Sequence, residues 1–153
     1  MRIPSKLKNF NCFHQTGSWL GIIAEATLPK LAMDMEEWRG GGMIAPVKIE
    51  RGMQLLETEI KLGGFVLDAL RSWGDPRVDG VYLRLVGAYQ ADDGSAPLAV
   101  ECIMRGRYEE IDWGNMKAGD DTEHTLKMPL AYYKLIIDGR TEIEVDPLFF
   151  TSW

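Results

Sequence analysis

The end of the chain contains the pattern that most limits its fold, two β-rich segments joined by a two-residue turn. Residues 132–137 are mostly aromatic and aliphatic, Asp138-Gly139 follows, and residues 140–146 run back. Asp-Gly is favoured in type I′ turns, because both central residues need a positive φ angle. The pattern therefore predicts an antiparallel hairpin and, with it, an antiparallel sheet.

Other segments show the same apolar, β-branched character between turn residues. Asp92-Asp93-Gly94-Ser95 separates two of them, which predicts a second hairpin. The predicted strands are 19–27, 57–62, 81–90, 98–107, 132–137 and 140–146. Strands therefore dominate the predicted fold.

One short helix is predicted over residues 65–73. Its apolar residues recur at spacings of three and four and form one stripe. Gly74 is placed for a left-handed C-cap, and Pro76 prevents the helix from continuing. A short helix among many strands predicts an α+β fold that is mainly β.

The length and composition predict one acidic domain over residues 1–153. A chain of 153 residues buries roughly 68–70% of its unfolded surface, and it is too short for two ordinary domains. The net charge is −6, and 46% of the residues are hydrophobic. No apolar run approaches the roughly 18 residues of a membrane span, and no secretory signal is predicted. We therefore expect a soluble domain that is not secreted.

The charge is distributed unevenly. Residues 1–76 hold equal numbers of basic and acidic side chains, so the excess acid lies entirely in residues 77–153. Binding to nucleic acid needs a clustered basic face, and the sequence contains none. A nucleic-acid reader is therefore not expected, whereas complementary contacts between copies are permitted.

The residue types that usually carry catalysis or bind metals are sparse. Cys12 and Cys102 are too few for a disulfide framework or a zinc site, so we expect buried thiols in a reducing compartment. His14 and His124 belong to no catalytic motif and are predicted to be surface or structural residues. Neither an enzyme nor a cofactor is predicted.

An acidic cluster could bind a divalent cation weakly. Asp120, Asp121 and Glu123 lack the order of an EF-hand loop, so a solvated loop or a charge between subunits is preferred. The cluster lies in a long stretch, 108–124, that is predicted to be an acidic loop.

A second long loop is predicted at 31–52. It contains Gly40-Gly41-Gly42, but the residues that follow are not those of a phosphate-binding loop. The glycines are therefore interpreted as a flexible tip.

Glu142, Glu144 and Asp146 alternate with Ile143 and Val145. A strand would place the three carboxylates on one face and the aliphatic residues on the other. That face is either an ordinary solvated sheet surface or the lining of a large aqueous space.

Several colinear segments resemble the major tail tube proteins of contractile-tailed phages and R-type tailocins. They are 3–11, 27–31, 38–43, 46–48, 62–65, 87–90, 105–107, 110–112, 119–124 and 132–135. The similarity covers most of residues 1–146. The chain departs from the family after the last strand, where residues 147–153 replace a longer tail.

The resemblance implies a small antiparallel β-barrel or sandwich with a flanking helix, forming hexameric rings. The rings stack into a hollow tube inside a contractile sheath, between baseplate or initiator and terminator proteins. The tube conducts DNA without specific binding or punctures an envelope. It implies no catalysis and no cofactor, and a place in the virion tail or tailocin particle, assembled in the host cytoplasm. The alternative is a soluble acidic binding domain that acts as a monomer or small oligomer.

In such a tube, two sets of residues acquire roles. We expect Trp38, Arg39, Gly40, Gly41, Gly42 and Met43 to contact the adjacent ring, because apolar groups there surround a glycine-rich tip. The alternative is that this stretch folds back and Trp38 is ordinary core. We expect Glu142, Glu144 and Asp146 to line a net negative lumen that repels DNA.

Overall fold

The computed structural model describes residues 6–14, 17–19, 22–92, 94, 96–114, 118–119, 123–147 and 151–152. Over these residues the chain forms twelve strands and one short helix. The elements are β1 (Lys6–His14), β2 (Gly17–Ser18), β3 (Ile23–Thr27), β4 (Met33–Trp38), β5 (Val47–Met53), β6 (Glu57–Leu62), α1 (Leu67–Arg71), β7 (Val81–Gln90), β8 (Leu98–Gly106), β9 (Glu110–Asp112), β10 (His124–Ile137), β11 (Arg140–Asp146) and β12 (Thr151–Ser152).

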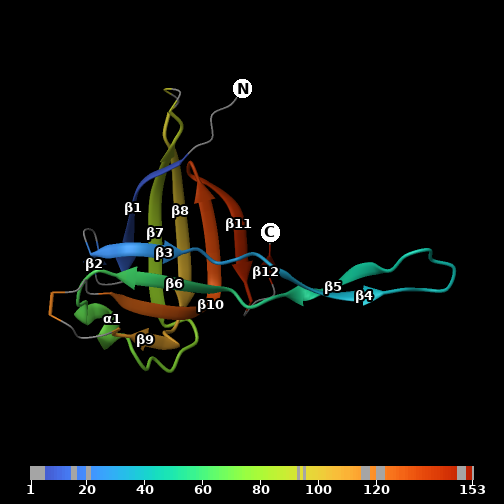
Figure 1. Ribbon diagram of the computed structural model, residues 1–153, viewed down its shortest axis with the longest axis horizontal. Coiled ribbons are helices and arrows are strands. Elements are labelled where there is room, and N and C mark those ends of the chain that lie inside the picture. Colours follow the sequence, from blue (N-terminus) through green and yellow to red (C-terminus); the bar gives the residue numbers. More distant parts are fainter. Residues whose placement is uncertain are drawn as a thin grey trace.

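Strand β10 is shared by two antiparallel sheets, and it turns from one into the other (Figure 1). Its first half pairs with β6 and β9, and β6 pairs in turn with β3. Its second half lies in a larger sheet whose strand order is β12-β11-β10-β8-β7-β1-β2. The two sheets enclose a half-barrel, which confirms the mainly β fold predicted from the sequence.

Both predicted hairpins are present. Asp138 and Gly139 have φ angles of 51° and 82°, as a type I′ turn requires, and they join β10 to β11. Strands β7 and β8 pair along their length around the second predicted turn. Local turn chemistry therefore positions four adjacent strands of the larger sheet.

One core fills the space between the two sheets and α1. Alternate residues of each strand point into it, and Cys12 and Cys102 are buried there as free thiols, as expected. Its largest fully buried members are Trp19, Ile60, Leu62, Leu83, Met104, Leu126 and Met128.

The predicted helix is shorter than expected and only partly buried. It spans Leu67–Arg71, and Gly74 adopts a φ of 82° two residues after the C-cap. Of its apolar stripe, Val66 and Ala69 reach the core, whereas the other members stay exposed. Among the described residues, no helix is long and apolar enough to cross a membrane.

Both stretches predicted as irregular loops contain strands, so that part of the prediction is wrong. Residues 31–52 form most of the β4–β5 hairpin, and 108–124 includes β9. Asp120 and Asp121 lie outside the described residues. The prediction failed because β4 and β5 mix charged and apolar residues on both faces, whereas burial of one face produces clean alternation.

Candidate assembly surfaces

The β4–β5 hairpin extends away from the half-barrel along the longest axis of the molecule (Figure 1). Among the described strands, β4 and β5 pair only with each other. Trp38 lies opposite Val47, and Glu36 lies opposite Ile49, so all four side chains share one face. We call Trp38, Val47 and Ile49 the hairpin face.

The hairpin is apolar where a monomer would be polar. Trp38 is 53% exposed, Ile44 at the tip is 97% exposed, and Val47 and Ile49 are each nearly half exposed. The expectation that apolar groups here are uncovered on a single copy is thus met, and the alternative that Trp38 is core is wrong. An exposed patch of this kind marks an interaction site.

The predicted contact residues Trp38 to Met43 all lie at the end of this hairpin. The Met43 N–H donates to the Gly40 carbonyl at 3.2 Å, and the Gly40 N–H donates to Met43 Sδ at 3.1 Å. Gly42 has a φ of 84°, Gly41 has open space around it, and Arg39 is exposed. The tip is therefore a hydrogen-bonded turn in which each glycine has a different environment.

A second exposed apolar surface surrounds α1. We call Phe65, Leu67, Leu70 and Trp73 the helix patch; their side chains are between 41% and 62% exposed. Phe65 stacks on Trp113 with ring centroids 5.0 Å apart, which fixes one edge of the patch. The sequence predicted this stripe as the covered side of the helix, and only half of it is covered.

The three carboxylates predicted to line a lumen lie on β11. Val145 is buried and Ile143 packs against the core, so Glu142, Glu144 and Asp146 lie on the opposite face of the larger sheet. Burial, followed by the negative charges of Glu144 and Asp146, raises the pKa of Tyr132 on the neighbouring strand. The carboxylates thus point away from the core.

The same sheet face also carries cations. Arg84, Arg105 and Lys134 alternate with buried residues on β7, β8 and β10, and Arg84 pairs with Glu101. Arg84 lies over the Phe13 ring, and Arg105 lies over the Tyr82 ring, each 5.3 Å from the centroid. These cations were missed because strand pairing, which the sequence does not give, brings them onto the face of β11.

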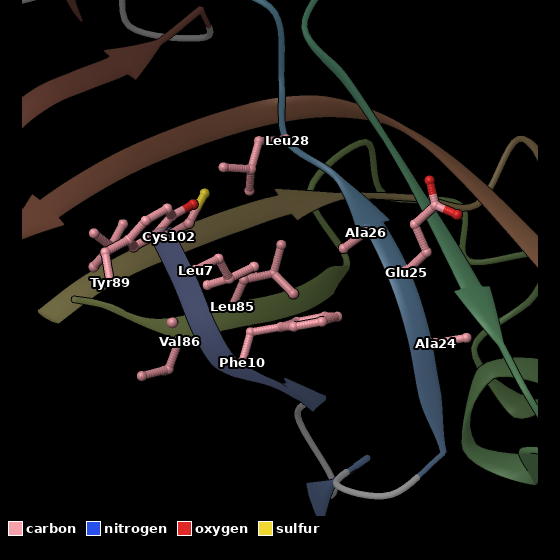
Figure 2. A pocket seen from close by; sticks show the side chains of 12 residues that line it. Leu7, Phe10, Ala24, Glu25, Ala26, Leu28, Leu85, Val86, Tyr89 and Cys102 are labelled. Atoms are coloured by element: carbon pink, nitrogen blue, oxygen red, sulfur yellow. The ribbon is translucent and has the colours of Figure 1, made fainter. Parts of the chain in front are cut away.

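An apolar groove of about 200 Å³ opens where the two sheets separate (Figure 2). Phe10 extends from β1 toward β3, and Leu7 and Leu28 are partly exposed at the groove. Strand β1 pairs with β2 only at Phe13 and His14, so much of its outer edge is unpaired within the described residues. The half-barrel therefore has an open seam here.

Both histidines serve the fold. His14 stacks on Trp19 at 5.2 Å and lies 3.2 Å, Nε2 to Oγ, from Ser72 after α1. Burial lowers the pKa of His14, and the charge of Asp68 opposes this. His124 packs edge-on against Phe65 and Trp113. No group of three potential metal ligands occurs among the described residues.

Comparisons with known proteins agree with this arrangement. The profile of the family Phage tail tube protein FII matches residues 4–151. The tail tube protein of Escherichia phage P2 is 38% identical over 151 residues, which cover 97% of this chain and 88% of that protein. The major tail tube protein of Serratia phage KSP20 is 37% identical over 152 residues, which cover 98% and 87%.

The fold also matches a solved assembly. A chain from the PVC sheath-tube complex of an extracellular contractile injection system, in its extended state, has a TM-score of 0.63 and 13% identity. The match covers 88% of this chain and 91% of that chain. Because the family profile and both relatives span nearly the whole sequence, this chain belongs to the phage tail tube protein FII family and is a structural subunit of a contractile tail tube in the virion tail, not an enzyme.

Proposed function

We propose that six copies of this chain close into a ring and that rings stack, through the β4–β5 hairpin, into a hollow tube. The exposed hairpin is the observation that carries this proposal. Its apolar face has no cover on a single copy, and ordering such a surface in solvent gains nothing for the monomer.

The larger sheet supports ring closure because both of its ends have free edges. At one end, β1 is unpaired over most of its outer edge, and at the other, β11 pairs with β12 only at Val145 and Asp146. Exposed edges invite pairing with another chain. Placing β1 of one copy beside β11 of the next would continue the sheet around a closed ring.

Stacking would bury Trp38 and the tip against the next ring. Trp38 is the anchor in this proposal, since large aromatic side chains dominate interface energies. Arg39 and the turn from Gly40 to Met43 would set the depth of contact. Removing an anchor of this kind typically costs about 2 kcal/mol, or roughly a 30-fold loss of affinity per contact.

Two tryptophan substitutions test the role of the hairpin. Trp38→Ala should fold normally and stack poorly in the presence of a tail initiator complex, as seen by electron microscopy. Trp19, which is 2% exposed, is the matched control. Trp19→Ala should destabilise the monomer by about 3–5 kcal/mol, because it empties a core site. Wild-type stacking by folded Trp38→Ala would reject Trp38 as an anchor.

Glu142, Glu144 and Asp146 would face the lumen if the outer face of the larger sheet forms the inner wall. Acidic groups there would repel DNA phosphates and keep the passage open. Arg84, Arg105 and Lys134 share this face, so its acidity would concentrate along β11 instead of covering the wall. Lysine at all three acidic positions should slow DNA ejection, and ejection at the normal rate would contradict this role.

The remaining partners follow from the assembly. A contractile sheath would surround the tube, and baseplate or initiator and terminator proteins would occupy its ends. The match to a chain from a solved sheath-tube complex supports this. Whether the particle conducts DNA or only punctures an envelope is tested by extracting nucleic acid from purified particles. Host-length genomic DNA predicts a phage, and its absence predicts a tailocin.

A further inference from the structure

The two exposed apolar surfaces of this chain lie at opposite ends of its longest axis (Figure 1). The hairpin face is Trp38, Val47 and Ile49, and the helix patch surrounds α1 on the far side of the half-barrel. Neither surface can cover the other within one copy. Two copies placed head to tail would bring them together.

We infer that the hairpin face of one copy docks on the helix patch of a copy in the adjacent ring, an inference that rests on the stacked tube proposed above. The contact is heterologous, since it joins two different surfaces. Each copy offers both surfaces, so the contact propagates without limit, as a growing tube requires.

The two surfaces match in chemistry and size. Both consist of large aliphatic and aromatic side chains that are roughly half exposed. A six-residue strand such as β4 spans about 20 Å, which exceeds the length of α1 and the turn that follows it. The hairpin is therefore long enough for one face to cover the whole patch.

Charge agrees with the apolar match. Arg71 follows Leu67 by four residues and so lies on the same flank of α1, where it is exposed. Arg71 forms no ion pair with the residues that the structure describes. Glu36 lies on the same side of the hairpin as Trp38, and its present partner Arg51 is 3.7 Å away and well exposed. Glu36 of one copy is thus placed to pair with Arg71 of the next.

Disulfide trapping tests the contact directly. A chain carrying Ile49→Cys and Leu67→Cys is assembled into tubes, checked by electron microscopy and then oxidised. The native thiols are buried and give little background. We expect a ladder of covalent oligomers. The matched control is Glu50→Cys with Leu67→Cys, because Glu50 lies on the opposite face of the hairpin; it should give no ladder.

The outcomes separate this inference from the proposed function. Tubes that form without a ladder would overturn the inference and leave the stacked tube intact. Absence of tubes from the wild-type chain with its initiator would reject both. Protection of Leu67→Cys from a thiol reagent only after sheath protein is added would assign the helix patch to the sheath and overturn the inference.

A charge exchange keeps the test valid if the cysteine pair fails to assemble. Glu36→Arg and Arg71→Glu should each weaken stacking by about two- to fivefold, the range of an exposed ion pair. The double variant should recover stacking, because the pair is restored with reversed polarity. Additive losses in the double variant would contradict the contact.

Discussion

The indole ring of Trp38 lies over Gly40, so closely that a β-carbon added at Gly40 would stand 2.7 Å from Cη2 of Trp38. The hairpin tip therefore holds the proposed anchor through the absence of a side chain. Gly41 has no atom within 4 Å of such a β-carbon. The glycine run combines one position that supports Trp38 with one that does not.

Gly40→Ala should displace the indole and weaken ring stacking, while leaving the stability of the monomer nearly unchanged because the site is far from the core. Gly41→Ala is the matched control and should stack as wild type does. Tube length by electron microscopy and thermal unfolding measure the two effects. Equal stacking by both variants would show that the orientation of Trp38 is unimportant.

Gly106→Ala should destabilise the whole fold. Gly106 ends β8 beside the point where β10 passes between the sheets, and an added β-carbon would lie 2.2 Å from the Pro129 carbonyl oxygen. Backbone must move to relieve that contact, so we expect a loss of more than about 2 kcal/mol. Gly17→Ala, where nothing lies within 4 Å, is the control. Chemical denaturation compares them, and equal stability would contradict the close packing.

Both native thiols should resist modification in the folded protein. Burial raises the pKa of Cys12 and that of Cys102 to about 12, so thiolate is scarce at pH 8. We expect no reaction with a thiol-specific reagent under native conditions and two equivalents after denaturation. Rapid modification of one thiol in assembled or free protein would show that the core opens near β1 or β8.

Stability should fall as the solution is acidified below pH 6.5. Burial lowers the pKa of His14, so the unfolded state, with a pKa near 6.5, binds the proton more strongly. The contribution of neutral His14 is complete above pH 6.5 and is lost as the pH falls toward the lowered value. His14→Gln should remove this part of the dependence between pH 7.5 and 5.5. An unchanged pH profile of the variant would contradict it.

The strands and turns that could be predicted from the sequence are those with one buried face. Strands β6 and β7 occur at the predicted residues, and the Asp138-Gly139 turn has the predicted geometry. Strand β10 was predicted only from Tyr132 onward. Pro129 interrupts its β pattern, and the structure places that proline where the strand leaves β6.

The assembly surfaces were predictable only in part. The tip from Trp38 to Met43 stood out because three glycines adjoin apolar residues. Val47 and Ile49 alternate with charged residues and were not recognised, although that alternation was available. The helix patch could not be predicted, because exposed Leu70 and buried Ala69 belong to the same apolar stripe until tertiary packing separates them.

The position of the β4–β5 hairpin in an assembled tube tests the account most directly. A cryo-electron microscopy reconstruction of tubes formed by this chain, at a resolution that shows side chains, would locate Trp38 and its neighbours. We predict that the hairpin crosses to the adjacent ring and that Trp38, 53% exposed on one copy, is buried against another copy. A tube in which the hairpin stays beside its own half-barrel, or in which Trp38 remains exposed to solvent, would contradict the account.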